Sequence, residues 1–120
     1  MKRRRPLAFI VFLALASTAS AQGAALSIPL PAGGDMRRES ARYDCANLGR
    51  LGVDYVTAGA VALALLEING QPRVFAQVLS GSGARYASGP YVWWTKGADA
   101  MLEDLRQGSG TPPLACSGVR

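Results

Sequence analysis

Residues 60–80 read AVALALLEINGQPRVFAQVLS. The run over 60–68 is almost wholly apolar, and its alanines and leucines would suit a helix as well as a strand. Asn69-Gly70 follows this run directly, and that dipeptide favours the two-residue turn of a β-hairpin. Residues 73–80 then supply a second run of strand length. The stretch therefore predicts a hairpin, with residues 60–68 as its first strand.

Further short runs of strand character lie on both sides of this hairpin. Residues 51–57 alternate, which places Val53 and Tyr55 on the same face. Residues 98–105 suit either a strand or a short helix. The other expected strands cover residues 41–46, 84–88, 91–96 and 114–116, with a turn at Ser88-Gly89-Pro90. Many short strands between frequent turns predict an all-β domain, either an antiparallel sandwich or a barrel.

The N-terminal residues have the pattern of an export signal. Basic residues at positions 2–5 precede an apolar run over 7–16, and small residues end at Ala19-Ser20-Ala21. This pattern predicts a secretory signal peptide over residues 1–21. Its apolar run is shorter than the roughly 20 residues that span a bilayer. A lipid anchor would need a cysteine at the cleavage point, whereas the first cysteine is Cys45. We therefore expect a soluble exported chain without a membrane anchor.

The chain after the signal divides into two parts. Residues 22–40 are rich in proline, glycine and small side chains and lack sustained periodicity, so we expect a flexible segment there. Regular patterning starts near residue 41, which predicts a single domain over residues 41–120. About 99 residues are enough for one domain, although near the small end for a hydrophobic core.

The composition argues against several classes of function. Four of the 13 basic residues and none of the 8 acidic residues lie within 1–21, which leaves 9 basic against 8 acidic side chains, a net charge of +1. Nucleic-acid binding depends on clustered cations, so we do not expect it. The chain has no histidine and hence no imidazole base, catalytic triad or histidine metal ligand. We expect no enzymatic activity, no metal and no cofactor.

The two cysteines predict a disulfide. In a small exported chain, a Cys45–Cys116 bond is the expected state of such a pair. It would close a loop of about 70 residues, for which chain-entropy estimates give roughly 4 kcal/mol of stabilisation. The competing interpretation, two free thiols in a redox or metal site, is disfavoured because no CxxC spacing occurs.

Residues 82–97, SGARYASGPYVWWTKG, hold both tryptophans and the only lysine after the signal segment. Strand alternation places Trp93 on one face and Trp94 with Lys96 on the other, so one tryptophan can enter the core. The alternation does not say which one. Whether the turn around Gly89 has two, three or four residues, Ser82 lies within about one residue of Lys96 across the hairpin. A hydroxyl and an ammonium are therefore expected to converge at the open end of this hairpin.

These residues resemble the signature of the membrane-bound and periplasmic inhibitors of c-type lysozyme, the MliC/PliC family. The family pattern SGxRY matches residues 82–86, and its WxKG pattern matches residues 94–97. Residues 43–45 resemble the family's YxC, and Cys116 lies where its second cysteine belongs. The resemblance extends over residues 40–116. It implies a small antiparallel eight-stranded β-barrel, closed by the Cys45–Cys116 disulfide, that inhibits an enzyme rather than acting as one.

The resemblance also implies roles for the site residues. Lys96 and Ser82 would enter the active-site cleft of a c-type lysozyme and contact its catalytic carboxylates. Arg85 and Tyr86 would chiefly shape the loop, with a contact role left open. The partner would be a c-type lysozyme, and the location the periplasm of a Gram-negative bacterium, where the inhibitor would protect peptidoglycan.

Two other hypotheses remain open at this point. The first is an exported barrel that binds an apolar ligand or a cell-wall glycan, with Trp93 or Trp94 as a stacking platform. The second, which we disfavour, is an enzyme with a Ser82/Lys96 pair, because nothing in the sequence identifies a substrate cleft or an oxyanion hole. A homodimer is also left open.

Overall fold

The computed structural model describes residues 23–29 and 34–120. The predicted signal peptide over 1–21 lies outside these residues. Residues 23–29 are exposed and have no regular secondary structure. Over the two described ranges, no helix is long and apolar enough to cross a membrane.

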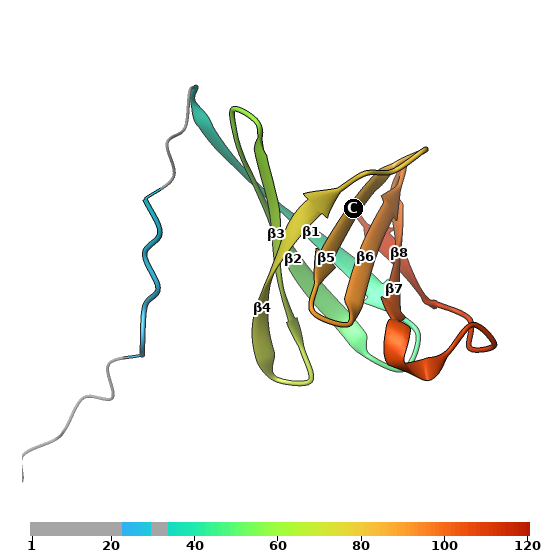
Figure 1. Cartoon of the computed structure of the whole chain (residues 1–120). Helices are drawn as coiled ribbons and strands as arrows, with labels where there is room; N and C mark the ends of the chain where they lie inside the picture. The colour runs from blue at the N-terminus through green and yellow to red at the C-terminus, as the bar shows by residue number, and fades with distance from the viewer. Residues whose placement is uncertain (1–22, 30–33) are drawn as a thin grey trace, which may run out of the picture.

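The domain consists of eight strands and one short 3₁₀ helix. Each strand is antiparallel to the next, and the last strand returns to pair with the first, so the sheet closes into a barrel (Figure 1). The expectation of an all-β, eight-stranded antiparallel barrel is therefore confirmed. The elements are β1 (Met36–Cys45), β2 (Gly49–Ala58), β3 (Val61–Ile68), β4 (Gln71–Val78), β5 (Ala84–Ser88), β6 (Tyr91–Lys96), β7 (Asp99–Asp104), η1 (Leu105–Gln107) and β8 (Leu114–Val119).

Strands β3 and β4 form the hairpin that the Asn-Gly dipeptide predicts. Ile68 pairs with Gln71, and the two residues between them, Asn69 and Gly70, have φ values of 51° and 75°. A type I′ turn requires positive φ at both central residues, which asparagine and glycine tolerate best. The helical alternative for residues 60–68 is thus excluded, because Val61–Ile68 form a strand that pairs with β4. The Asn-Gly turn favours this outcome, since it reverses the chain sharply.

The strand boundaries differ from the expected ones at the start of the domain. β1 begins at Met36, not near residue 41, and residues 36–40 pair with β2. Its other ladder, to β8, covers only Arg42–Cys45. The first half of β1 therefore has one neighbour, and both of its faces are largely exposed. The missing apolar alternation in MRRES follows from that exposure, since no face of this segment is selected for burial.

Two alternatives in the second half of the chain are decided by the structure. The turn between β5 and β6 has two residues, since Ser88 pairs with Tyr91. Residues 98–105 are a strand for most of their length, β7, which is followed by η1. Asp104 caps η1, because its side chain accepts a hydrogen bond from the backbone N–H of Arg106.

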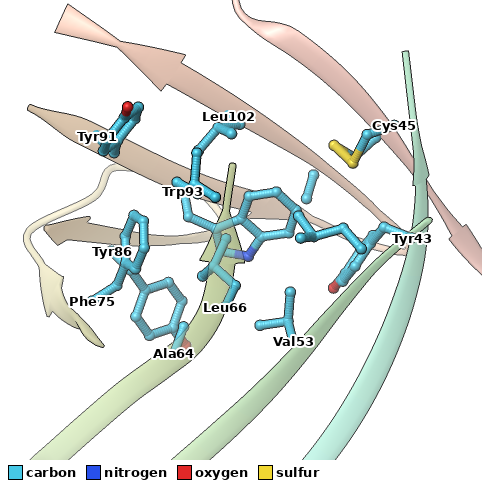
Figure 2. Close-up of a cluster of buried hydrophobic side chains, with 14 residues drawn as sticks. Tyr43, Cys45, Val53, Ala64, Leu66, Phe75, Tyr86, Tyr91, Trp93 and Leu102 are labelled. Atoms are coloured by element: carbon cyan, nitrogen blue, oxygen red, sulfur yellow. A yellow bond between two sulfur atoms is a disulfide. The ribbon is translucent and has the colours of Figure 1, made fainter. Parts of the chain in front are cut away.

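The interior of the barrel is organised around Trp93, which is 0% exposed (Figure 2). Its ring lies edge-to-face against Tyr43 at a centroid distance of 5.1 Å. Its indole Nε1 donates a 2.8 Å hydrogen bond to the hydroxyl of Tyr55, whose oxygen also lies 2.9 Å from that of Tyr43. The polar atoms of these three aromatic side chains therefore satisfy one another inside the barrel. The rest of this core cluster comprises Cys45, Leu51, Val53, Ala64, Leu66, Ile68, Phe75, Tyr86, Tyr91, Ala100, Leu102 and Cys116.

The predicted disulfide is present at the closure of the barrel. Cys45 in β1 and Cys116 in β8 are direct cross-strand partners and are bonded to each other. The ladder between these two strands covers only Arg42–Cys45 of β1, so the covalent bond reinforces a short pairing that completes the barrel. The next residue, Ala46, extends this contact through a 3.1 Å backbone hydrogen bond to Ala115.

Candidate functional site

The loop of residues 79–83, between β4 and β5, is held tightly against the end of β6. Gly83 has φ 63°, and a Cβ at this position would lie 2.0 Å from the backbone oxygen of Thr95 and 3.2 Å from Cγ of Lys96. No side chain fits at such a distance, and a positive φ favours glycine as well. Gly83 therefore permits the close approach that brings the loop beside Lys96.

Ser82 lies in this loop and is exposed. Its backbone oxygen accepts two hydrogen bonds, one of 2.6 Å from the Ser80 hydroxyl and one of 2.9 Å from the indole Nε1 of Trp94. The β5–β6 register pairs Ala84 with Thr95, so its continuation places Ser82 level with Gly97. This register is the two-residue-turn case of the sequence prediction, in which Ser82 lies one residue from the position opposite Lys96.

Lys96 is the last residue of β6 and is exposed. Its Nζ lies 4.0 Å from the centroid of the Trp94 ring, a cation–π contact. Its cross-strand neighbour is Asp99, yet no ion pair joins the two among residues 34–120. The Asp99 carboxylate instead accepts a long hydrogen bond of 3.4 Å from the backbone N–H of Gly118. Lys96 is thus exposed, and no carboxylate of residues 34–120 forms an ion pair with its ammonium.

The structure separates Arg85 from Tyr86, the two other predicted site residues. Arg85 pairs across the strands with Trp94, and its guanidinium carbon lies 5.9 Å from the centroid of that ring. Tyr86 faces the interior, is only 7% exposed and packs against the Tyr55 ring at 5.7 Å. Burial raises the pKa of Tyr86 above its ordinary value. Ser82, Arg85 and Lys96 therefore share one surface around Trp94, and Tyr86 supports it from within.

The central position of Trp94 in this surface is missing from the sequence prediction. Trp94 is half-buried on the outer face, whereas Trp93 is in the core, so Trp93 is unavailable as a stacking platform for a glycan. The signal in the sequence was the i, i+2 spacing of Trp94 and Lys96, which places both side chains on the same face of a strand. Strand alternation alone does not reveal that the two side chains are in contact.

The site lacks the contacts that a Ser/Lys hydrolase would need. In the part of the chain that the structure describes, no hydrogen bond links the Ser82 hydroxyl to the Lys96 ammonium. A serine nucleophile needs a base within hydrogen-bond reach. The same part of the chain contains no group of three side chains suited to hold a metal ion.

The opposite end of the barrel contains a cavity of about 560 Å³, bounded by the β1–β2 turn, Asn69, Tyr91 and residues 102–115. Beside it, Arg106 donates hydrogen bonds of 2.9 and 2.7 Å to the two carboxylate oxygens of Asp104 and one of 2.9 Å to the Tyr91 hydroxyl. These bonds from Arg106 hold the pKa of Asp104 below its usual value. The Arg106 guanidinium is therefore neutralised within the protein, whereas Arg73, whose guanidinium carbon lies 4.7 Å from the centroid of the same Tyr91 ring, forms no ion pair within residues 34–120.

Comparison with known proteins assigns the family. The model of the family described as membrane-bound lysozyme-inhibitor of c-type lysozyme (MliC) matches residues 43–109. A relative named membrane-bound lysozyme inhibitor of C-type lysozyme, from Pseudomonas aeruginosa, is 37% identical over 91 residues, which are 74% of this chain and 72% of the relative. A relative of the same name from Cupriavidus necator is 40% identical over 72 residues, which are 60% of this chain and 58% of the relative.

A solved structure is similar as well. The crystal structure of Pseudomonas aeruginosa MliC in complex with hen egg white lysozyme is 33% identical in sequence. It superposes with a TM-score of 0.68 over 84% of this chain and 100% of that one. The barrel, the disulfide and the loop beside Lys96 thus occur in a chain whose sequence and fold both match this group. The chain belongs to the family of membrane-bound lysozyme inhibitors of c-type lysozyme, MliC.

Proposed function

We propose that this protein inhibits a c-type lysozyme by inserting Lys96 and Ser82 into the acidic active-site cleft of the enzyme. The observation that carries the proposal is an exposed lysine at one end of a closed barrel, beside an exposed serine and without an ion pair to any carboxylate in the described part of the chain. Family membership and the similarity to a chain solved in complex with a lysozyme support the choice of partner.

The chemistry of glycoside hydrolysis explains why a cation would inhibit. Such an enzyme needs one carboxyl group protonated as the general acid, while the other is ionised. An ammonium between the two favours the ionised form of both, so the general acid is lost. Charge-assisted hydrogen bonds to carboxylates are about twice as strong as neutral ones. Lys96 would therefore both occupy the cleft and shift the protonation of its catalytic pair, with the Ser82 hydroxyl as an additional donor.

The other two motif residues have different roles in this proposal. Tyr86 is buried among the core aromatics, so it would stabilise β5 rather than contact the enzyme. Arg85 lies on the outer face beside Trp94, where its guanidinium would meet the rim of the cleft. We expect Tyr86→Phe to leave inhibition unchanged.

The location of the protein is part of the proposal. Its relatives are named membrane-bound inhibitors, which suggests the bacterial envelope. The basic, apolar and small-residue pattern of residues 1–21 supports export, and no cysteine lies at its predicted cleavage point. We propose a soluble periplasmic protein that starts after Ala21. Fractionation followed by N-terminal sequencing tests this, and recovery of a lipid-linked form from the membrane would contradict it.

The functional experiment measures the lysis of peptidoglycan-bearing cells by a c-type lysozyme at increasing inhibitor concentrations. We expect Lys96→Ala to raise the inhibition constant about 100-fold or more, as for removal of one partner of a desolvated ion pair. Ser82→Ala should raise it about tenfold, since a donor to a charged acceptor is lost. Val74→Ala, at an exposed outer position in β4, is the control and should behave as wild type.

Circular dichroism and thermal melting establish that each variant is folded. Both Lys96 and Ser82 are exposed, so neither substitution should lower the melting temperature appreciably. Inhibition at the wild-type level by both the Lys96→Ala and the Ser82→Ala variants would sink the proposal that these residues fill the active site.

A further inference from the structure

We infer that Trp94 is the positioning residue of this site, which holds Ser82 and Lys96 in their binding arrangement before the enzyme arrives. The inference rests on the proposed function and extends it to a residue that does not itself need to enter the cleft. It depends on two separate contacts of the same indole ring, one through its N–H group and one through its π face.

The first contact fixes the loop. The indole Nε1 donates a 2.9 Å hydrogen bond to the backbone oxygen of Ser82. The Ser80 hydroxyl donates to the same oxygen at 2.6 Å, so the carbonyl is held from two sides. With its carbonyl held in this way, the exposed Ser82 side chain remains available for a partner. A loop of this length would otherwise sample several backbone conformations, and each would have to be given up on binding.

The second contact fixes the ammonium. Lys96 and Trp94 are two residues apart on β6, and therefore on one face of the sheet, with Nζ 4.0 Å from the ring centroid. Arg85 approaches the same ring at 5.9 Å from the neighbouring strand. Lysine has a long, flexible side chain, so a partner that restrains its rotamers reduces the entropy lost on binding.

An indole ring is a suitable partner for a cation that must later be transferred to a carboxylate. A cation–π contact at an exposed site is weak, whereas a carboxylate next to a guanidinium or ammonium competes with any outside acid. The cross-strand neighbour Asp99 would be such a competitor, yet its carboxylate is directed to the backbone N–H of Gly118. The ring therefore orients the ammonium without neutralising its charge.

The alternative is that Trp94 only covers the outside of the sheet. It lies between Arg85 on β5 and Met101 on β7, where any large side chain would bury area. A purely structural tryptophan would affect inhibition independently of Lys96. A positioning tryptophan acts partly through Lys96, so its removal should matter less once the ammonium is gone.

The test is a double-mutant cycle on inhibition constants, with Trp94→Leu, Lys96→Met and the double variant. In the wild-type background we expect Trp94→Leu to raise the inhibition constant about tenfold, from the combined loss of a hydrogen bond and a cation–π contact. In the Lys96→Met background, Trp94→Leu should raise the inhibition constant only about twofold, because only its effect on Ser82 remains. Equal factors in the two backgrounds would overturn the inference.

Two further measurements separate the two contacts. Trp94→Phe keeps an aromatic face but has no N–H group, so it should raise the inhibition constant by about threefold, less than Trp94→Leu. In the free protein, NMR should show the ε-methylene protons of Lys96 shifted upfield by the indole ring and returned to ordinary lysine values in Trp94→Leu. Ordinary values in the wild type would overturn the inference, and so would a Trp94→Phe loss as large as that of Trp94→Leu.

The failure of the inference is distinguishable from the failure of the proposed function. A wild-type protein that does not inhibit any c-type lysozyme overturns the proposed function, and the inference with it. A wild-type protein that inhibits, with equal Trp94→Leu factors in the two backgrounds, overturns the inference alone. Thermal melts of the Trp94 variants, compared with Val74→Ala as the truncation of an exposed apolar side chain on the outer face, establish that all of them are folded.

Discussion

Strand β6 has two cations beside an aromatic ring at each of its ends, Arg73 and Arg106 at Tyr91 and Arg85 and Lys96 at Trp94. Within residues 34–120, only Arg106 among these four forms an ion pair. At its start, the Arg106 guanidinium lies 5.3 Å from the Tyr91 ring centroid and forms a bidentate pair with Asp104. At its end, the Lys96 ammonium lies 4.0 Å from the Trp94 ring centroid, with no ion pair within residues 34–120. The two ends thus share one kind of aromatic contact and differ in charge balance.

This difference indicates that the charge of Arg106 stabilises the fold, whereas the charge of Lys96 is available to a binding partner. Arg106 is bonded to a carboxylate and a phenol of its own chain, so it holds η1 against the barrel. Lys96 keeps an unbalanced charge at the surface, which is what an acidic partner can recognise. The aromatic ring orients the cation in both cases. Lys96 remains available because it is exposed and has no ion pair within residues 34–120, whereas Arg106 is held by Asp104.

The largest effect should come from removing the disulfide, which joins β1 to β8 at the residue that closes β1. Replacing both Cys45 and Cys116 by alanine should lower the free energy of unfolding by about 4 kcal/mol, as expected for a loop of this length. Inhibition per folded molecule should not change, because both cysteines are buried in the core whereas Lys96 lies on the exposed surface. Urea unfolding and lysis assays under folding conditions test both statements. A decrease in the free energy of unfolding of less than about 1 kcal/mol would show that the β1–β8 pairing is stable without the disulfide.

The second effect concerns the close approach of the loop to β6. Gly83→Ala would place Cβ 2.0 Å from the Thr95 oxygen at a positive φ, so the loop must move away from Lys96. We expect the inhibition constant to rise about 100-fold, near 2.7 kcal/mol. Gly81→Ala, in the same loop but with nothing within 4 Å of the added carbon, is the matched control and should be close to wild type. Equal losses in both variants would contradict this account.

A third experiment converts the Lys96 end into a copy of the Arg106 end. Met101 pairs with Trp94 and lies on the same face as Asp99, so Met101→Glu would place a carboxylate diagonally across from Lys96. We expect inhibition about tenfold weaker, because the ammonium now has an internal partner, with partial recovery at high salt. Met101→Gln is nearly the same shape without the charge and should inhibit as wild type does. Identical behaviour of the Glu and Gln variants would show that charge balance is irrelevant here.

The smallest effect should be the contribution of Asp104 to stability. Hydrogen bonds from Arg106 lower the pKa of Asp104 in the folded state below the unfolded value. The resulting stabilisation is present above the ordinary aspartate pKa and is lost as the pH falls through the folded one. Asp104→Asn should therefore melt slightly below wild type at pH 7 and alongside it near pH 2, with inhibition at pH 7 unchanged. Thermal melts across this pH range provide the check, and a pH-independent difference would contradict the assignment.

The fold was predictable where local signals agree. Asn69-Gly70 specifies its own turn, and the strands on either side need no distant partner to be recognised. The side on which Trp93 lies was not predictable, since it depends on Tyr43 and Tyr55 from strands far away in the sequence. The start of β1 at Met36 was missed for a similar reason: an exposed segment has no buried face to reveal it.

The residues of the site could be predicted from the sequence motif, but the contacts between their side chains could not. The spacing of residues 82–97 brought Ser82 and Lys96 to one end of a hairpin, and the register agrees. The hydrogen bond from Trp94 to the Ser82 carbonyl and the lysine–indole contact are matters of side-chain conformation. No strand alternation encodes them, and the same is true of the Asp99 carboxylate that turns to Gly118 instead of Lys96.

The pairing of β1 with β8 also governs when the protein can complete its fold. β1 is the first strand of the described domain and β8 the last, and Cys45 and Cys116 are 71 positions apart in the chain. Contacts between such distant segments carry a large loop-closure cost and slow the folding of β-proteins. Until residues 114–119 have emerged, β1 has only β2 as a neighbour. A chain without residues 114–119 can therefore form only an open sheet, and the barrel closes once its last strand is in place.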